Sequence, residues 1–368
     1  MKITLRDVAL AAGVSMTAAS MALSDSGRLS DETRERVRRS ARELGYKAKT
    51  LAPLRMEEGP AVGILMSLDV EWAFIFHFIR PIIEEIGSTL AVHGLTTILV
   101  PISRRDTAED IYAKVQKSRV IAVAPLHYGN EILFEKLESA GIPVVLIMNS
   151  NFQDRFYSVC VDDYQGAYEG TCRLIRRGHR TIGYLDCVRQ DLPQLLVDRF
   201  FGFRKAVEEY GLDFDDSLKA RVEPEDIAGL AGTLERMLSD NPGLTALFAL
   251  DDDLALRIVV ALSTIGRRVP ADLSLIAPGD VLDYELPHIP RICTMRIDTA
   301  YMGKIAAQMI LNRIQHNPQE IHVLKVKQQL VRRGSVATGP AGLSPGEETE
   351  SIDPARLIYP VERSGLRV

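Results

Sequence analysis

From Ala61 onward, short apolar runs alternate with longer amphipathic segments, and this alternation is the strongest constraint on the fold. The segments IRPIIEEIGSTLAVHG and DRFFGFRKAVEEYG have the apolar spacing of helices that bury one face. Alternating strands and helices predict parallel sheets covered by helices on both faces. The span 61–337 is long enough for two such sheets, with a ligand beyond the carboxyl ends of the strands. The apolar runs include residues 61–66, 96–100, 120–124, 144–148, 181–185, 246–250 and 273–277.

The first half of the N-terminal segment predicts two short helices joined by a tight turn. Thr4 followed by Asp7 resembles a capping box that opens the first helix, and Gly13 ends it. Ser15 can cap a second helix over residues 16–23. Two short helices with a glycine-containing turn between them are typical of a helix-turn-helix, whose second helix enters the major groove of DNA.

A third helix follows in the same segment. Ser30 is its predicted N-cap, and Gly45 is the residue that ends it. Val37, Ala41 and Leu44 share the face that would point inward. On spacing alone, the alternative is a three-helix domain of unknown purpose.

The charge of the chain is divided unevenly between its two parts. Residues 1–55 contain 11 Lys and Arg against 6 Asp and Glu, which gives them a net charge of +5. The whole chain has a net charge of −5, so the remaining residues carry −10. A basic head on an acidic body indicates that only the head meets phosphate.

The string TLRDVALAAGVSMTAASMALSDSGRLSDETRERVRRSARELGY resembles the DNA-binding head of the lac repressor (LacI/GalR) family. The words DVA, AGVS, SDETRERV and LGY carry this resemblance. It continues through the body in GIL, AGIPVV, LIRRGHRTIGYL, DRFFGFRKA, LFALDDDLAL, RVPADLSLI and RICTMRID. The resemblance implies a sequence-specific transcriptional regulator, with repression as the favoured output. It also implies an all-α helix-turn-helix head and an α/β body of two doubly wound parallel-sheet subdomains, like a periplasmic binding protein.

The resemblance assigns a DNA-binding role to individual residues of the head. It places Met16, Thr17 and Met21 at base edges, with the small side chain of Ala18 able to contact a thymine methyl group. Met21 stands where the family usually has the arginine that reads guanine, so the operator should differ from the family pattern there. The residues assigned to the phosphate backbone or to the same interface are Thr4, Ser15, Ser20, Arg28, Thr33 and Tyr46.

Residues 47–60 resemble the hinge of the family only loosely. That hinge usually forms a short helix that wedges an apolar side chain, usually Leu, into the minor groove. Here the wedge position holds Arg55, with Leu54 before it, and Pro53 is tolerable only in the first turn of a helix. The hinge is therefore a helix that begins near Ala52, an extended segment whose Arg55 reaches an A·T minor groove, or a plain linker.

The resemblance divides the chain into parts. Residues 1–46 form the DNA-binding head and 47–60 the hinge. Residues 61–337 form the effector-binding and dimerisation domain, with subdomains at about 61–161 plus 291–320 and 162–290 plus 323–336. Residues 338–368 exceed the usual end of the family, and their Gly, Pro, Ser and Glu content predicts a disordered or loosely docked tail.

Candidate effector residues follow strands or match family words. Arg199 matches the cleft-facing arginine of the family word (E/D)RxxGF, and Asp251 stands where the family usually has Asn. The alternative to effector binding is, for each candidate, a structural role such as a helix cap or a surface carboxylate. The family segment GFDD reads APGD here, with Gly279 at the ligand position, which puts a sugar bound in the customary way in doubt. The full candidate set is Ser67, Asp69, Trp72, Asp162, Arg199, Asp251 and Asp280.

Other classes of protein are disfavoured. The sequence lacks a P-loop, HExxH and GxGxxG after a strand, and its 7 His and 4 Cys show no metal spacing. We therefore expect no enzyme, cofactor or metal, and no membrane segment or signal peptide. A small-molecule binding protein without DNA-dependent regulation is the alternative. The expected protein is a cytoplasmic homodimer or tetramer that binds double-stranded operator DNA and a sugar-like effector.

Overall fold

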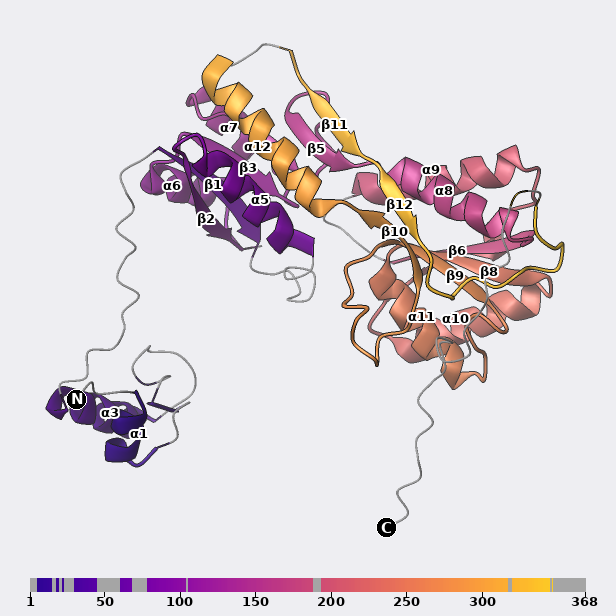
Figure 1. Ribbon diagram of the computed structural model, residues 1–368, viewed down its shortest axis with the longest axis horizontal. Helices are drawn as coiled ribbons and strands as arrows, with labels where there is room; N and C mark the ends of the chain where they lie inside the picture. The colour runs from indigo at the N-terminus through magenta and orange to yellow at the C-terminus, as the bar shows by residue number, and fades with distance from the viewer. Residues whose placement is uncertain are drawn as a thin grey trace. The chain divides into compact units, whose positions relative to one another are not determined.

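The computed structural model consists of two separate compact units, Met1–Gly59 and Pro60–Val368 (Figure 1). We call the first unit the head and the second the body. Within the body, the first lobe is the sheet that contains β1 with its helices, and the second lobe is the sheet that contains β6 with its helices. The structure describes residues 5–14, 18–19, 22, 30–44, 60–67, 78–103, 105–187, 193–316, 320–344 and 346.

The head contains α1 (Leu5–Ala12) and α3 (Asp31–Glu43), and Ala18, Ala19 and Ala22 between them are also helical. Gly13 ends α1 in a left-handed conformation with φ of 63°, which glycine adopts without steric cost. The Ser30 hydroxyl accepts the Thr33 amide at 3.3 Å, as predicted for the N-cap of α3. A small apolar core joins the three segments. It contains Val8, Ala9, Ala12, Ala19, Ala22, Val37 and Ala41.

The first lobe is built on a six-stranded sheet with the order β11-β5-β4-β3-β1-β2, and all its neighbouring strands run parallel. Two helices, α5 and α12, cover one face, while α6 and α7 cover the other. The strands are β1 (Ala61–Ser67), β2 (Thr96–Ile102), β3 (Ala122–Leu126), β4 (Val145–Ile147), β5 (Tyr157–Val161) and β11 (Val323–Val326). The helices are α5 (Arg80–Ala91), α6 (Ala108–Ser118), α7 (Glu131–Ser139) and α12 (Thr299–His316).

The second lobe has the strand order β12-β10-β9-β8-β6-β7, with only the edge strand β12 antiparallel to its neighbour. Helices α8 and α9 cover one face, and α10 and α11 cover the other. The strands are β6 (Thr181–Cys187), β7 (Lys219–Val222), β8 (Leu244–Ala249), β9 (Ser274–Gly279), β10 (Cys293–Ile297) and β12 (Gln328–Val331). The helices are α8 (Asp163–Arg176), α9 (Pro193–Glu209), α10 (Ile227–Asp240) and α11 (Asp252–Thr264), with a 3₁₀ turn at Asp216–Leu218.

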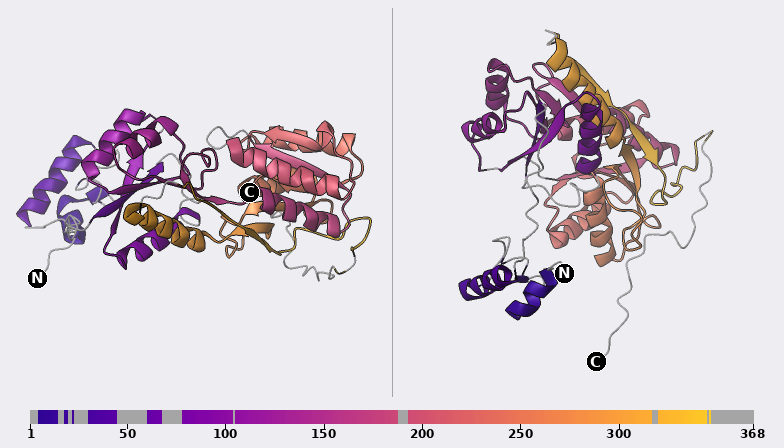
Figure 2. Two further views of the ribbon diagram at one scale, coloured as in Figure 1. Left: turned by 90° about the horizontal axis from the view of Figure 1, so that it is seen from above. Right: turned by 60° about the vertical axis from the view of Figure 1, so that its left-hand side comes forward.

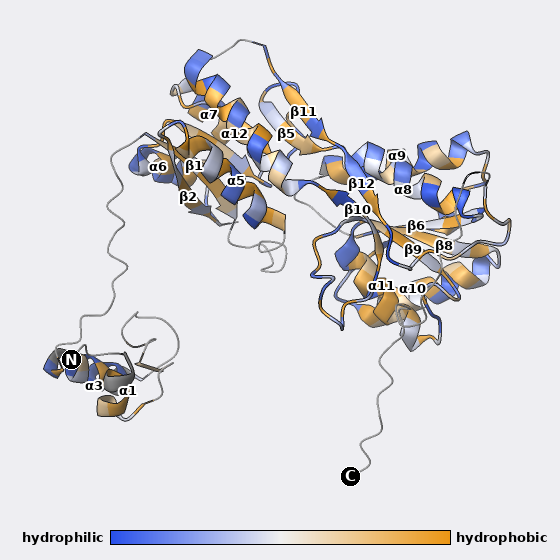
Figure 3. Cartoon of the chain, in the orientation of Figure 1, coloured by the Kyte–Doolittle hydropathy of each residue, from blue (hydrophilic) through white to orange (hydrophobic). Residues whose placement is uncertain are grey.

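Both sheets therefore have helices on each face, as Figure 2 shows from two further directions. Hydrophobic residues follow the central strands between these helices, as the hydropathy colouring of Figure 3 shows. This confirms the predicted α/β body of two parallel sheets, in which strands covered on both faces are nearly continuous apolar runs. No helix among the described residues is long and apolar enough to cross a membrane.

Two strands lie in the opposite lobe to the predicted one. The span 291–320 was predicted for the first lobe, yet β10 pairs with β9 in the second sheet, and only α12 from this span packs in the first lobe. The span 323–336 was predicted for the second lobe, yet β11 pairs with β5 in the first sheet. The connection 280–292 returns the chain to the edge of β9, so β10 pairs with its sequence neighbour. The chain crosses between lobes after β5, after β10 and after β11.

The predicted tail also needs a correction at its start. Residues 338–344 are not disordered, because their backbone amides bond to carbonyls at the end of α8 and in the turn after it. Ser335 and Val336, immediately before them, are fully buried in the second lobe. The remainder of the predicted tail, apart from Gly346, lies outside the described residues.

Candidate functional site

Four of the predicted effector residues lie at carboxyl ends of parallel strands. Ser67 is the last residue of β1, and Asp162 directly follows β5 in the same sheet. In the second sheet, Asp251 follows β8 and Asp280 follows the neighbouring strand β9. Carboxyl ends of parallel strands meet at one edge, so each lobe gathers its two candidates on one edge of its sheet. Asp69 and Trp72 lie outside the described residues.

The same strand ends carry unusual backbone conformations. His127, Met148 and Asp280 adopt φ of 51°, 57° and 72° at the ends of β3, β4 and β9. Residues other than glycine rarely adopt positive φ, and such residues concentrate at ligand sites. His127 and Asn149, next to Met148, were missed as candidates. Both follow apolar runs that the sequence shows, so the strand-end criterion could have found them.

Asn149 connects several loops at the edge of the first sheet. Its side chain is fully buried, donates to the Tyr128 carbonyl at 2.8 Å and accepts the Asn151 amide at 2.9 Å. Its own carbonyl accepts the Cys160 thiol at 3.0 Å. The Asn151 side chain in turn accepts the Gln194 amide of α9 at 3.2 Å, which links the two lobes. The Asn149 side chain therefore holds the loop whose Asn151 bonds to the second lobe.

Arg199 extends from α9 toward the carboxyl edge of the second sheet, where it is 5% exposed. Its Nε donates to Asp163 at 2.7 Å, and its Nη1 donates to the carbonyl of Leu250 at the end of β8. Burial raises the pKa of the Asp163 carboxyl, and the adjacent guanidinium opposes that rise. The ion pair with Asp163 joins α8 to α9, and the hydrogen bond to Leu250 joins α9 to the end of β8.

Asp162 and Asp251 have structural roles that sequence reasoning left open. The Asp162 carboxylate accepts the Gln165 amide at 3.1 Å and caps α8. The Asp251 carboxylate accepts the Leu254 amide at 2.9 Å and caps α11. Both are half-buried, so a cap and a ligand contact remain compatible.

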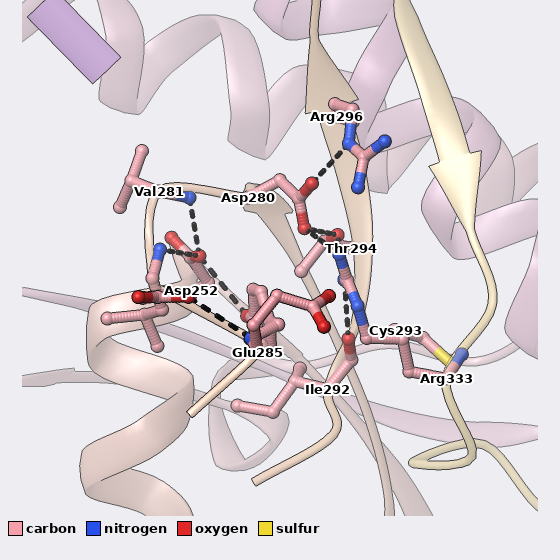
Figure 4. A network of polar contacts seen from close by, with 12 residues as sticks. Asp252, Asp280, Val281, Glu285, Ile292, Cys293, Thr294, Arg296 and Arg333 are labelled. Atoms are coloured by element: carbon pink, nitrogen blue, oxygen red, sulfur yellow. Dashed lines mark hydrogen bonds and ion pairs between the residues drawn. The ribbon is translucent and has the colours of Figure 1, made fainter. Parts of the chain in front are cut away.

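Asp280 is the centre of a charged network that extends from β9 to the end of the chain's last strand (Figure 4). It accepts the Thr294 hydroxyl at 2.7 Å and forms ion pairs with Arg296 and Arg333. The Arg333 guanidinium lies 3.8 Å from the ring centroid of Tyr284 and donates to Thr294 at 2.8 Å. Arg333 and Arg296 were not among the predicted residues. The network fastens the loop after β9 to β10 and to the segment after β12.

Asp252, the first residue of α11, holds the other side of this loop (Figure 4). Its Oδ2 accepts the Val281 and Leu282 amides at 2.8 and 3.2 Å and the Tyr284 hydroxyl at 3.2 Å. Its Oδ1 is buried and has no hydrogen-bond partner in the described part of the chain. A Cβ on Gly279 would come 2.5 Å from that oxygen. Gly279, at φ of 127°, is therefore required by the close approach of Asp252.

Burial raises the pKa of Asp252 to about 7, and the nearby Asp251 adds to the rise. A raised carboxyl pKa means that the folded state keeps the proton, so the folded protein loses stability as pH rises from 3.8 to about 7. Asp252→Asn keeps the acceptor for the loop and carries no charge. We expect the unfolding free energy of the variant to fall less steeply in this window, by about 1 kcal/mol per pH unit.

Urea unfolding at several pH values measures this difference. Asp253→Asn is the matched control, since it removes the neighbouring carboxylate, and its curve should follow that of the wild type. Parallel curves for Asp252→Asn and the wild type would contradict the assignment.

In the head, Ala18 and Thr33 are the predicted DNA-binding residues that the structure describes. Ala18 is half-buried in a helix, and the Thr33 hydroxyl lies 2.8 Å from that of Ser30 in the first turn of α3. The other predicted residues lie outside the described part. They are Thr4, Ser15, Met16, Thr17, Ser20, Met21, Arg28, Tyr46, Leu54 and Arg55.

Metal-binding side chains do not gather in the described ranges, where no group of three or more His, Cys, Asp or Glu could hold an ion. His179 is 2% exposed, contacts the Thr245 hydroxyl at 2.9 Å and the Ala337 carbonyl at 3.2 Å, and has its pKa lowered to about 4 by burial. These contacts make it a structural residue at the start of β6.

Comparisons with known proteins match both units of the chain. Residues 4–49 match the family model of bacterial regulatory proteins of the lacI family. Residues 171–336 match the model of a periplasmic binding protein-like domain. Together they cover the head and most of the second lobe.

Curated relatives extend the similarity over nearly the whole chain. The HTH-type transcriptional repressor PurR of Pectobacterium carotovorum subsp. carotovorum (strain PC1) is 27% identical over 343 residues, which cover 92% of this chain and 98% of the relative. PurR of Serratia proteamaculans (strain 568) is 28% identical over 342 residues, with the same shares covered.

Solved structures show the same fold. A complex of the transcriptional regulator CelR with cellobiose has a TM-score of 0.63 and 26% identity, covering 90% of this chain and 99% of that one. The lac repressor dimer bound to operator and an anti-inducer has a TM-score of 0.59 and 22% identity, covering 92% and 100%.

Proposed function

We propose that the chain is a member of the lacI family of bacterial regulatory proteins, and that it is a repressor that binds operator DNA under the control of a small molecule. The observation that carries the proposal is the joining of a lacI-type head to a periplasmic binding protein-like body in one chain. The body alone would also suit a small-molecule binding protein, and the attached head is what favours a regulator.

The head supplies the DNA contacts in this proposal. Residues 1–46 enter the major groove, and residues 47–60 connect them to the body. A single head buries too little surface for tight specific binding, so two chains place their heads in successive major grooves of a near-palindromic operator. Met21 in place of an arginine makes the preferred base pair at that position differ from a guanine read bidentately.

The body supplies the effector site. The proposed effector is a sugar or related metabolite, in keeping with the cellobiose of the CelR complex. We propose that it binds between the strand ends of the two lobes, with Ser67 and Asp162 contributed by one sheet edge and Asp251 and Asp280 by the other. Asp69, Trp72 and Arg199 complete the proposed set. Because Arg199 already bonds to Asp163 and Leu250, an effector would share that side chain with the protein.

Effector binding is proposed to change the relation between the lobes, and with it the spacing of the two heads of a dimer. That coupling requires an effector that binds one arrangement of the lobes more tightly than the other. We further propose that the protein acts in the cytoplasm, where operator DNA lies, and that it catalyses no reaction.

A binding experiment on the full chain tests the proposal. Fluorescence anisotropy with DNA fragments from around its own gene should find one fragment that binds at least about 1,000-fold more tightly than unrelated DNA. Affinity should fall steeply with salt, since bound phosphates release counterions. A thermal-shift screen of sugars, sugar phosphates and nucleobases should find a compound that stabilises the body and changes the operator affinity. Equal affinity for all fragments would contradict the proposal.

A further inference from the structure

The segment after β12 is bound along the end of α8. Three backbone amides of this segment donate to carbonyls of the last turn of α8 and of the turn after it. The pairs are Gly339 to Arg177, Ala341 to Gly178 and Ser344 to Arg176, at 2.7, 3.1 and 2.8 Å. A Cβ on Gly178 would come 2.1 Å from the Gly342 carbonyl oxygen, so the two backbones are in direct contact. The chain is therefore fixed on the layer of α8 and α9 before its last residues begin.

That layer carries apolar side chains on its outer surface. A groove with a volume of about 520 Å³ lies between Tyr164 of α8 and Phe201 of α9, bordered by Arg204 and Lys205. Phe201 is 58% exposed, Tyr164 is 39% exposed, and Val197, one turn before Phe201, is 42% exposed. We call this surface the α8–α9 groove. Adjacent large exposed apolar side chains mark a surface that another segment covers.

The end of α9 lies beside the fixed segment. Tyr210, directly after the end of α9, is 41% exposed, and its hydroxyl accepts from the Arg176 Nε at 3.3 Å. The Arg176 carbonyl is the acceptor for the Ser344 amide. Ser344 therefore lies at the C-terminal end of α8, beside the C-terminal end of α9.

The remaining chain is long enough to cover the groove. Ten residues, 347–356, join Gly346 to Leu357, and the connection could span up to about 36 Å when extended. The 14 residues of α8 extend over about 21 Å. The sequence Leu357–Val361 reads LIYPV, which is the one uninterrupted apolar run after residue 346. Pro360 favours an extended conformation at Tyr359, which suits a strand-like segment lying between two helices.

The charges at the groove are balanced. Asp198 and Glu208 line it together with Arg204 and Lys205. Arg204 forms an ion pair with Glu208, and Lys205 forms one with Glu209. The acidic stretch 346–353, which reads GEETESID, lies ahead of the apolar run, so the docking depends on the apolar contacts and on the reach of the chain.

We propose that Leu357–Val361 docks in the α8–α9 groove of its own chain. Tyr164 directly follows Asp163, and Phe201 is two residues after Arg199, so the docked segment covers the outer side of the turns that hold the buried ion pair. The last residues of the chain thereby brace the wall of the second lobe.

Hydrogen–deuterium exchange on the full chain tests this docking. Amides of residues 355–363 should exchange at least about tenfold more slowly than their intrinsic rate, which corresponds to about 1.4 kcal/mol of protection. Phe201→Glu in the groove should return them to the intrinsic rate. Ile358→Asp in the tail should do the same, and it cannot unfold the body. The control is Ile132→Glu, which changes a side chain that is 70% exposed on α7 and should leave the protection intact.

Three results would overturn the proposal. They are intrinsic-rate exchange in the wild type, protection that persists in Phe201→Glu, and protection that grows with protein concentration, which would assign the groove to a second copy. None of these results would contradict the proposed DNA binding, because the exchange experiment contains no operator DNA.

Discussion

Replacing Val37 by aspartate is expected to abolish specific operator binding while the body stays folded and binds its effector. Val37 is fully buried in the small apolar core of the head. A buried carboxylate without a partner costs several kcal/mol, which a core of this size cannot offset. The head and the body are separate compact units, so the damage should stay in the head. Operator affinity should fall at least about 1,000-fold, to the level of non-specific binding.

The matched control is Leu10→Gln, at a position that is 72% exposed on α1 of the same head. It should keep operator affinity within a few-fold of the wild type. Anisotropy with the operator measures both variants, and the thermal shift produced by the effector shows whether the body is intact. Full operator affinity in Val37→Asp would show that the head does not carry the DNA contacts.

The second large effect is expected from Asp163→Ala, which leaves Arg199 buried without its carboxylate. Both side chains are 7% exposed, and the bond between them is 2.7 Å. Removing one partner of a buried pair costs about 3–5 kcal/mol, because the remaining charge is desolvated and uncompensated. The urea midpoint should fall accordingly. Asp213→Asn, an exposed carboxylate beyond the end of α9, should leave it unchanged.

A double variant separates stability from ligand binding. Asp163→Leu with Arg199→Met replaces the pair by apolar side chains and should recover much of the lost stability. If Arg199 also binds the effector, the double variant stays stable yet loses effector affinity. A loss of stability no larger than that of Asp213→Asn would contradict the structural role of the ion pair.

Apolar periodicity predicted the strands that are covered on both faces. Residues 61–66 and 246–250 read as uninterrupted apolar runs because helices shield them from both sides, and they became β1 and β8. The edge strands β7 and β11 read KARV and VLKV, and their exposed positions break the pattern. β10 pairs with its sequence neighbour β9, whereas the lobe membership of β11 could not be predicted, since it depends on which sheet edge is open after α12 has packed on α5.

The candidate site shows the same limit. Strand ends are visible in the sequence, and that criterion placed Ser67, Asp162, Asp251 and Asp280 on the sheet edges. The partners of Asp280 could not be found in this way. Arg333 comes from beyond the last strand, and no local pattern connects it with the loop after β9. Likewise, the need for glycine at position 279 arises from the approach of Asp252, which only the folded chain reveals.

The pairing of β11 with β5 affects how the protein can fold during its synthesis. The first sheet is one strand short from the time Val161 leaves the ribosome until Val326 follows, and β5 is its open edge. At roughly 5–20 residues per second, that interval lasts about 10 to 30 s. An unpaired edge strand can join another chain during this time, so the nascent protein is exposed to aggregation until almost the last strand is made. The first lobe cannot be produced alone by truncating the gene at a single point, because its strand β11 follows β6–β10 of the second sheet.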